Sequence, residues 1–445
     1  MLVLRSHRLS FPHLFVTIRF LYVFFLSLHS IYNMSTPLFI SKKISLGGRN
    51  RVASFIAVAG VGCATAIMIL TLAVSLGFKS QIKEKLRGFN ADISVNPAYN
   101  YTSSSQNEFL QLTPELEKQI EQFTPSGHSM ALRQPGILKT GDDYATLIFT
   151  AFDPSHDFGF ERANILCGEF PDYSKTDNSN RIVISSTTAS RLGLNVGDNI
   201  TACFFVDEHI KARKFEIAGL YASNFGDYDR TVCYSSLGAL QKVCGLDSLG
   251  GTAVEMRGIP VHDVPGIAEG LQAALIEEAQ VKGADEVLVV DNITRTGAMY
   301  LNWLDLLDTN VVVIFIIMCC VATFTLVSSL FIVILNHISA IGILRAVGMN
   351  KAAVRRTFVM VAMRLVGIGL IVGNILAISA ILVQDKWNVI PLDPEMYYLS
   401  SVPVSLSWKG IVAIDLGTAV LSWLILILPA RLASSVSPAK TMRYD

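Results

Sequence analysis

Four long apolar runs limit what this chain can fold into more than any other feature of its sequence. Each run is long enough to cross a bilayer, which takes about 20 helical residues, and none contains more than one charged residue. Runs of this kind are typical of transmembrane helices. We therefore expect four transmembrane α-helices, at residues 52–78, 311–335, 358–383 and 411–428.

The net charge of zero conceals an uneven distribution of charge along the chain. Residues 79–310 carry 31 acidic and 19 basic side chains, a net charge of −12, so the rest of the chain carries +12. The basic residues lie beside the apolar runs, which argues against a nucleic-acid-binding protein. This division suits a membrane protein whose large soluble part lies on the opposite side from its basic loops.

Lysine and arginine collect in three of the segments that flank the apolar runs. Residues 34–51, 336–357 and 429–445 together hold 11 basic residues and one acidic residue, Asp445. Positively charged loops stay on the cytoplasmic side of a membrane. We therefore expect a cytoplasmic N-terminal segment, a cytoplasmic loop and a cytoplasmic tail. The outer loop at residues 384–410 carries four aromatic residues typical of a membrane interface: Trp387, Tyr397, Tyr398 and Trp408.

The N-terminal extension, residues 1–33, needs a separate interpretation. Its apolar stretch is interrupted by Pro12, His13, Arg19 and His29. It could be a signal peptide, a fifth span, or the result of a start codon placed too early, with Met34 as the true start. We favour the last interpretation, because no cleavage or capping pattern supports the others.

Residues 79–310 form the outer domain, which is large enough for one domain or two small subdomains. Its patterning predicts a mixed α/β (α+β) fold inserted between the first and second spans. We expect helices at residues 114–122, 186–192, 237–243 and 264–280, and strands at 146–151, 181–185, 199–206, 214–221 and 286–291. Because both ends of the domain rise from membrane helices, helix motion can be transmitted into it.

The sequence contains no motif for catalysis, cofactor binding or metal binding. It has no phosphate-binding loop, no H-E-x-x-H pair and no glycine-framed nucleophile. The outer domain holds four cysteines, for which we favour buried free thiols over disulfides because their spacing is irregular and Cys203 and Cys233 lie in strand-like segments: Cys167, Cys203, Cys233 and Cys244.

Small and charged residues within the spans predict helix contacts. Gly369 and Gly373 lie one turn apart and should let the third span pack closely on another helix, in this chain or in a second copy. Arg364 and Asp415 could form an ion-coupling pair. We favour the interpretation that Arg364 lies within two turns of the inner surface, which its side chain can reach, and that Asp415 lies one turn from the outer surface.

The inner loop at residues 336–357 predicts a short helix. An apolar edge runs along Ile338, Ile341, Leu344 and Val347, and Gly348 is suited to end the helix. Such a helix could rest on lipid headgroups or dock into a cytoplasmic partner.

Several stretches carry a resemblance to a known family. Residues 327–330 and 341–348 (Ile-Gly-Ile-Leu-Arg-Ala-Val-Gly) resemble the second span and coupling helix of MacB/FtsX-type ABC transporter permeases. Residues 50–56, 88–93 and 397–404 (Tyr-Tyr-Leu-Ser-Ser-Val-Pro-Val) are similar to the lipoprotein-releasing LolC/LolE branch of that family. The chain departs from the family at Ser339 and Ala340, where an acidic residue usually precedes the coupling helix.

The resemblance implies a permease in the bacterial inner membrane, with both termini cytoplasmic and a MacB-like periplasmic domain. Two such chains, identical or paralogous, would work with a cytoplasmic ABC ATPase that binds the ATP. The ATPase would couple through Ile341, Leu344, Arg345 and Gly348.

The implied substrate is a lipoprotein, released from the inner membrane to a periplasmic carrier. Its acyl chains, like membrane lipid, would lie against Leu70, Val74, Val311 and Phe315. Two alternatives remain open: a related permease for drug or peptide export or for regulation of cell-wall hydrolases, and a membrane-anchored sensor or scaffold without transport.

Overall fold

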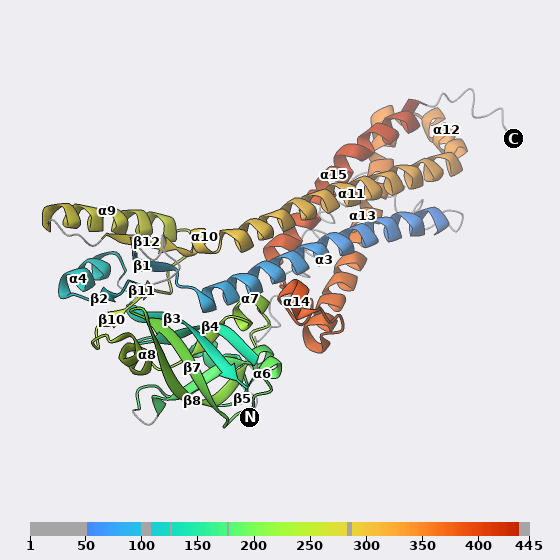
Figure 1. Ribbon diagram of the computed structural model, residues 1–445. Coiled ribbons are helices and arrows are strands. Elements are labelled where there is room, and N and C mark those ends of the chain that lie inside the picture. Colours follow the sequence, from blue (N-terminus) through green and yellow to red (C-terminus); the bar gives the residue numbers. More distant parts are fainter. Residues whose placement is uncertain are drawn as a thin grey trace. The chain divides into compact units, whose positions relative to one another are not determined.

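The computed structural model describes residues 51–98, 108–124, 127–141, 143–175, 178–282 and 287–435, which form two compact units (Figure 1). One unit contains residues 51–73, 310–382 and 406–435. The other contains Val74–Thr309 together with Val383–Ser405. The expectations for residues 1–50, for Glu286 and for the tail beyond Ser435 lie outside the described residues.

Four long helices form most of the first unit, and three of them continue beyond it. They are α3 (Arg51–Phe89), α11 (Ala298–Asn336), α13 (Lys351–Trp387) and α15 (Trp408–Ser435). Within the described part of the chain, these are the helices that are long and apolar enough to cross a membrane. The predicted outer boundaries at residues 79 and 310 fall inside α3 and α11, because both helices run on past their apolar stretches.

The spans are held together by small and branched apolar side chains. The buried cluster combines residues of all four helices, among them Ala57, Val61, Leu330, Phe358 and Leu426. Small residues on α3 bring its backbone close to its neighbours, which favours packing between helices in lipid. The short helix α12 (Ile338–Ala346) joins α11 to α13.

Among the described residues, ten strands of the second unit form one hydrogen-bonded sheet. They are β1 (Ile93–Pro97), β3 (His128–Thr140), β4 (Asp143–Phe152), β5 (Ile165–Gly168), β6 (Arg181–Ser185), β7 (Asn199–Val206), β8 (His209–Tyr221), β9 (Val232–Tyr234), β11 (Ala253–Met256) and β12 (Leu288–Asn292). Two further strands, β2 (Leu110–Gln111) and β10 (Gly250–Gly251), pair with each other.

Part of the sheet closes on itself. Strand β7 pairs antiparallel with both β3 and β8, so the order β3-β4-β9-β6-β8-β7 forms a ring. A closed ring leaves fewer strand edges open to pairing with another chain. Helices α6 (Ser186–Leu192) and α8 (Leu237–Cys244) add residues to its core, whose buried members include Leu138, Phe149, Ile182, Phe204 and Phe215.

The rest of the sheet forms a second core with two helices. Strands β12, β1 and β11 extend from β3, and helices α4 (Pro114–Phe123) and α9 (Val264–Lys282) lie beside β1 and β12 (Figure 1). The core includes Ile93, Ile120, Val254 and Leu271. The remaining helices are short: α5 (Gly159–Ala163), α7 (Gly226–Asp229), α10 (Ile293–Thr296) and α14 (Pro394–Tyr397).

Local signals in the sequence account for several of these elements. Thr113 caps α4, since its hydroxyl oxygen accepts the backbone N–H of Leu116, as its position before Pro114 predicts. Gly193 ends α6 in a left-handed conformation, which favours glycine. Strand β3 and the first half of β8 were not predicted, because the sequence indicated no strand there.

Candidate functional site

The outer ends of α3 and α11 are built into the second unit. On α3, Ile82, Leu86 and Phe89 are buried at helical spacing. On α11, Leu304 is buried in the same aromatic cluster as Ile82 and Phe89. Leu86 lies so close to Gly297 that a Cβ on the glycine would stand 2.5 Å from the Leu86 Cδ2 atom. Both helices therefore end in one packed core.

Arg87 and Asp92 tie the last turn of α3 to the strand that follows. The Nε and Nη2 atoms of Arg87 donate to the two carboxylate oxygens of Asp92 at 2.7 and 2.6 Å. Arg87 Nη2 also donates to the carbonyl of Ile259 at 2.8 Å, and Asp92 accepts the Ile259 N–H at 3.0 Å. A bidentate arginine–carboxylate pair of this kind fixes the orientation of the two side chains as well as the distance between them.

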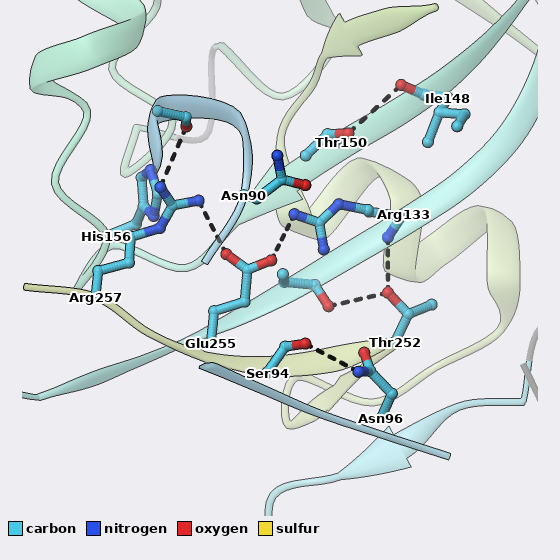
Figure 2. Close-up of polar contacts among 12 residues, drawn as sticks. Asn90, Ser94, Asn96, Arg133, Ile148, Thr150, His156, Thr252, Glu255 and Arg257 are labelled. Atoms are coloured by element: carbon cyan, nitrogen blue, oxygen red, sulfur yellow. Dashed lines mark hydrogen bonds and ion pairs between the residues drawn. The ribbon is translucent and has the colours of Figure 1, made fainter. Parts of the chain in front are cut away.

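A buried carboxylate, Glu255 on β11, lies between two arginines (Figure 2). Arg133 of β3 contacts its Oε1 atom at 2.5 Å, and Arg257 donates to its Oε2 atom at 3.0 Å. Arg257 also donates to the carbonyls of Arg87 and Gly88, at 2.8 and 3.2 Å. These carbonyls belong to the last turn of α3, where backbone acceptors lack partners within the helix. One buried anion thus holds the cation that caps α3.

Two opposing effects set the pKa of the Glu255 carboxyl. Burial disfavours the charged form and would raise the pKa. The charges and hydrogen bonds of Arg133 and Arg257 outweigh burial and hold the pKa below its usual value. Glu255 is therefore ionised in the folded protein at neutral pH.

Helices α3 and α13 cross at glycines. A Cβ on Gly373 would stand 2.6 Å from the carbonyl oxygen of Gly62, and one on Gly369 would stand 2.8 Å from the Cβ of Val61. The structure thus places both α13 glycines against α3 of the same chain, a point that the sequence left open. Backbones in such contact leave no room for a larger side chain.

Helix α11 meets α3 at a glycine and through a hydrogen bond. Ser329 donates a hydrogen bond to the carbonyl of Ala53 at 2.7 Å, and a Cβ on Gly60 would stand 2.6 Å from the hydroxyl oxygen of Thr325. Only 11% of the most apolar stretch of α11 is buried, against 44% on α3. Most of the apolar surface of α11 is therefore left to contact lipid or another chain.

The four residues predicted to face lipid lie on these two helices. Leu70 and Val74 are one turn apart on α3, and Val311 and Phe315 are one turn apart on α11. All four side chains are half-buried, and nearby Ile316 is 59% exposed. A lipid-facing role for the four residues stays a prediction.

The inner loop contains α12, whose predicted contact residues divide into two kinds. Ile341 is 2% exposed and packs in the cluster of the spans with Val354 and Phe358. It therefore holds α12 in place and offers no surface to a partner. Arg345 is half-buried in the last turn, and the side chain of Leu344 lies outside the described residues.

The exposed apolar residues of α12 and its end are not the predicted contact residues. Ile343 is 60% exposed, and Val347, just past the end of the helix, is 83% exposed. Gly348 follows with a φ of 104°, a left-handed conformation that favours glycine and ends the helix. The sequence analysis placed Val347 on the apolar edge but missed Ile343, whose exposure depends on how α12 packs against the spans.

Asp415 has a partner that the sequence analysis missed. Both of its carboxylate oxygens lie near the amide nitrogen of Asn374 on α13, at 3.0 and 3.1 Å. Asp415 is 9% exposed, so it is a buried contact between α15 and α13. The partner seen here is thus Asn374 and not Arg364.

All seven cysteines are free thiols in the structure. In the outer domain, Cys233 and Cys244 are buried, Cys203 is half-buried and Cys167 is exposed. Burial raises the pKa of Cys244 to about 11, which keeps that thiol protonated and unreactive at neutral pH.

Two protein families match consecutive parts of this chain. Residues 54–294, more than half of the chain, match the MacB-like periplasmic core domain. Residues 311–438 match the FtsX-like permease C-terminal family.

Individual relatives match along nearly the whole chain. The lipoprotein-releasing system transmembrane protein LolC of Xylella fastidiosa (strain 9a5c) is 24% identical over 426 residues, which cover 89% of this chain and 96% of that protein. The corresponding LolE of Haemophilus influenzae (strain ATCC 51907 / DSM 11121 / KW20 / Rd) is 23% identical over 433 residues, covering 92% and 99%. The solved periplasmic region of MacB from Actinobacillus actinomycetemcomitans is 14% identical with a TM-score of 0.32, covering 49% of this chain and 97% of that structure.

The crossing of α3 and α13 predicts a strong effect of one added methyl group. We expect Gly373→Ala to destabilise the protein by about 1–3 kcal/mol, because the new Cβ meets the backbone of Gly62, which cannot rotate away. Gly417→Ala is the control, since nothing lies within 4 Å of that position on α15. Thermal unfolding of the purified protein in detergent measures both, and equal melting temperatures would contradict the close crossing.

The charge network predicts that Glu255→Gln lowers stability at neutral pH, by about 1.5–3 kcal/mol, because two half-buried arginines lose charge-assisted hydrogen bonds to a buried anion. Because the folded pKa of Glu255 is lowered, its stabilising contribution is complete above the ordinary value of 4.5 and is lost as the pH falls further. Melting curves of the full chain at several pH values should therefore converge for the two proteins in acid. Glu216→Gln is the control, because Glu216 is an exposed partner of Arg181 at 3.7 Å. A difference between wild type and Glu255→Gln that persists in acid would count against the network.

Proposed function

Because this chain belongs to the FtsX-like permeases with a MacB-like periplasmic core domain, we propose that it releases lipoproteins from the inner membrane for transfer to the outer membrane. Permeases of this family are the transmembrane subunits of ABC transporters, so the chain works with an ATPase and does not hydrolyse ATP itself. It is a multi-pass membrane protein with a periplasmic domain.

The observation that carries the proposal is the match along nearly the whole chain to proteins named for lipoprotein release. The match covers 89% of this chain for the LolC protein and 92% for the LolE protein. If the relatives matched only one domain of this chain, the match would support a permease but would not indicate its substrate.

The arrangement of α3 and α11 supports a path for acyl chains. Each is one unbroken helix of 39 residues that continues from an apolar stretch into the packed core of the outer domain. The acyl chains would lie along Leu70, Val74, Val311 and Phe315, and a periplasmic carrier would accept the lipoprotein.

The proposed ATPase contact is α12 with the turn that follows it. Ile343 and Val347 offer exposed apolar side chains, and Arg345, Lys351 and Arg355 give this loop a positive charge. The positive charge favours a cytoplasmic location, which also places both termini in the cytoplasm. Ile341 and Gly348 would serve coupling by fixing the position and the end of the helix.

A second permease chain completes the proposed transporter. Most of the apolar surface of α11 is not buried within this chain. A partner chain, identical or paralogous, would face α11 and enclose the acyl chains between the two copies.

We predict that Ile343→Asp uncouples the transporter. A charge in an apolar contact should weaken ATPase binding by about tenfold or more, while the exposed position leaves the fold intact. The measurement is the amount of ATPase that co-purifies with each variant. Ile276→Asp, at an exposed position on α9, is the matched control. Unchanged recovery of the ATPase with Ile343→Asp would rule out α12 as the contact.

Depletion of the protein in its host tests the function directly. We expect lipoproteins destined for the outer membrane to accumulate in the inner membrane, as membrane fractionation would show. The purified permease and its ATPase, placed in vesicles with a lipoprotein, should release it only when ATP is hydrolysed. Correct lipoprotein sorting after depletion would refute the proposal and leave export or hydrolase regulation as the alternatives.

A further inference from the structure

The segment between α13 and α15, residues 383–405, folds into a compact loop that we name the strap. Gln384 closes its base: its Nε2 atom donates to the carbonyl of Val402 at 3.0 Å, and its Oε1 atom accepts the N–H of Ile390 at 3.1 Å. A backbone hydrogen bond from Val402 to Ile390, 3.1 Å long, joins the two sides. The strap is therefore an ordered element and not a loose connection.

The strap lies against the outer part of α3. A Cβ on Gly77 would stand 2.5 Å from the carbonyl oxygen of Pro403, so the two backbones are in contact. Leu399 is 2% exposed and packs in the cluster that contains Ile82. The contacts on α3 extend from Gly77 to Lys85, about 12 Å along the helix at 1.5 Å per residue.

Lys85 fastens the tip of the strap. Its Nζ atom donates to the carbonyl of Tyr398 at 2.7 Å and to the carbonyl of Asn224 at 3.4 Å. An ammonium group has three donors, so one lysine can satisfy both carbonyls. Tyr398 and Asn224 have φ values of 59° and 55°, which are uncommon for residues other than glycine and need support from their surroundings.

Aromatic rings extend this joint to the start of α11. The ring of Tyr398 lies 5.0 Å from that of Phe225 and 5.9 Å from that of Tyr300. Asp227 accepts a hydrogen bond from the Tyr300 hydroxyl at 2.8 Å and interacts in the same way with Tyr398. The strap thus contacts α3, α11 and the turn at residues 222–230 at one place.

We propose that Lys85 is a positioning residue for transport: it fastens the strap to α3, so that the third and fourth spans move together with the first. The strap continues directly from α13 and into α15, and Lys85 lies on the extension of the first span. Detaching the strap would leave ATP hydrolysis possible but would loosen the outer part of α3, from Gly77 to Lys85, from the third and fourth spans. The transport part of this inference rests on the proposed function, whereas the fastening does not.

Hydrogen exchange of the full chain in detergent tests the fastening. Lys85→Met keeps the aliphatic stem and removes the donors, so we expect the amides of Leu392 and Val402 to exchange about tenfold faster. Exchange in β3 and β4 should not change. Lys85→Arg keeps a charged donor and should restore slow exchange.

Transport is measured as lipoprotein released per ATP hydrolysed, with the permease and its ATPase in vesicles. We expect Lys85→Met to lower this ratio at least about fivefold and Lys85→Arg to restore it. A loss of fold alone would lower ATP hydrolysis and release together, leaving the ratio of the remaining activity unchanged.

Gly77→Ala detaches the strap by a different route, because its Cβ meets the Pro403 carbonyl. It should speed exchange and lower the ratio as Lys85→Met does. Slow exchange in both variants would overturn the fastening, and fast exchange with an unchanged ratio would overturn the role in transport. If the wild-type transporter releases no lipoprotein, the proposed function fails, while the exchange comparison still decides the fastening.

Discussion

A helix that ends inside a folded domain presents carbonyl groups that no further turn can satisfy, and on α3 these are met by a half-buried guanidinium. The Arg257 charge is balanced there by the buried carboxylate of Glu255, which is shared with Arg133 of β3. A cation next to the carbonyl end of a helix is also favoured by the helix dipole. The end of the first membrane helix is therefore bound by charge to two strands of the sheet. Without that anion, two half-buried cations would lie at the same place with nothing to balance their charge.

The contacts of α3 within the spans differ in kind between its two neighbours. Against α13, glycine backbones touch, and such contacts allow almost no sliding without a clash. Against α11, the close points are Gly60 with Thr325 and a single hydrogen bond from Ser329. Lipid tails are as apolar as the side chains they would replace, so separating α11 from α3 would cost little in burial.

The sequence predicts the spans and the capped helices of this fold, because hydropathy and capping are local signals. It does not predict β3, whose centre reads Gln134-Pro135-Gly136, since proline and glycine are depleted in strands. It also misses the first half of β8, which is polar and exposed. The pairs Glu255 with Arg133 and Asp415 with Asn374 join residues far apart in the chain, so no spacing reveals them. The contacts of Lys85 are even harder to predict from the sequence, because its acceptors are backbone carbonyls, which every residue has.

Contacts within the first unit form a series from the inner loop to the crossing of α3 and α13. Ile341 packs α12 against Val354 and Phe358 at the start of α13. Helix α13 then meets α3 at Gly62. Both steps are tightly packed contacts, and packed contacts do not deform gradually. A displacement of α12 by a partner protein would therefore move α12, α13 and the inner part of α3 together as whole helices.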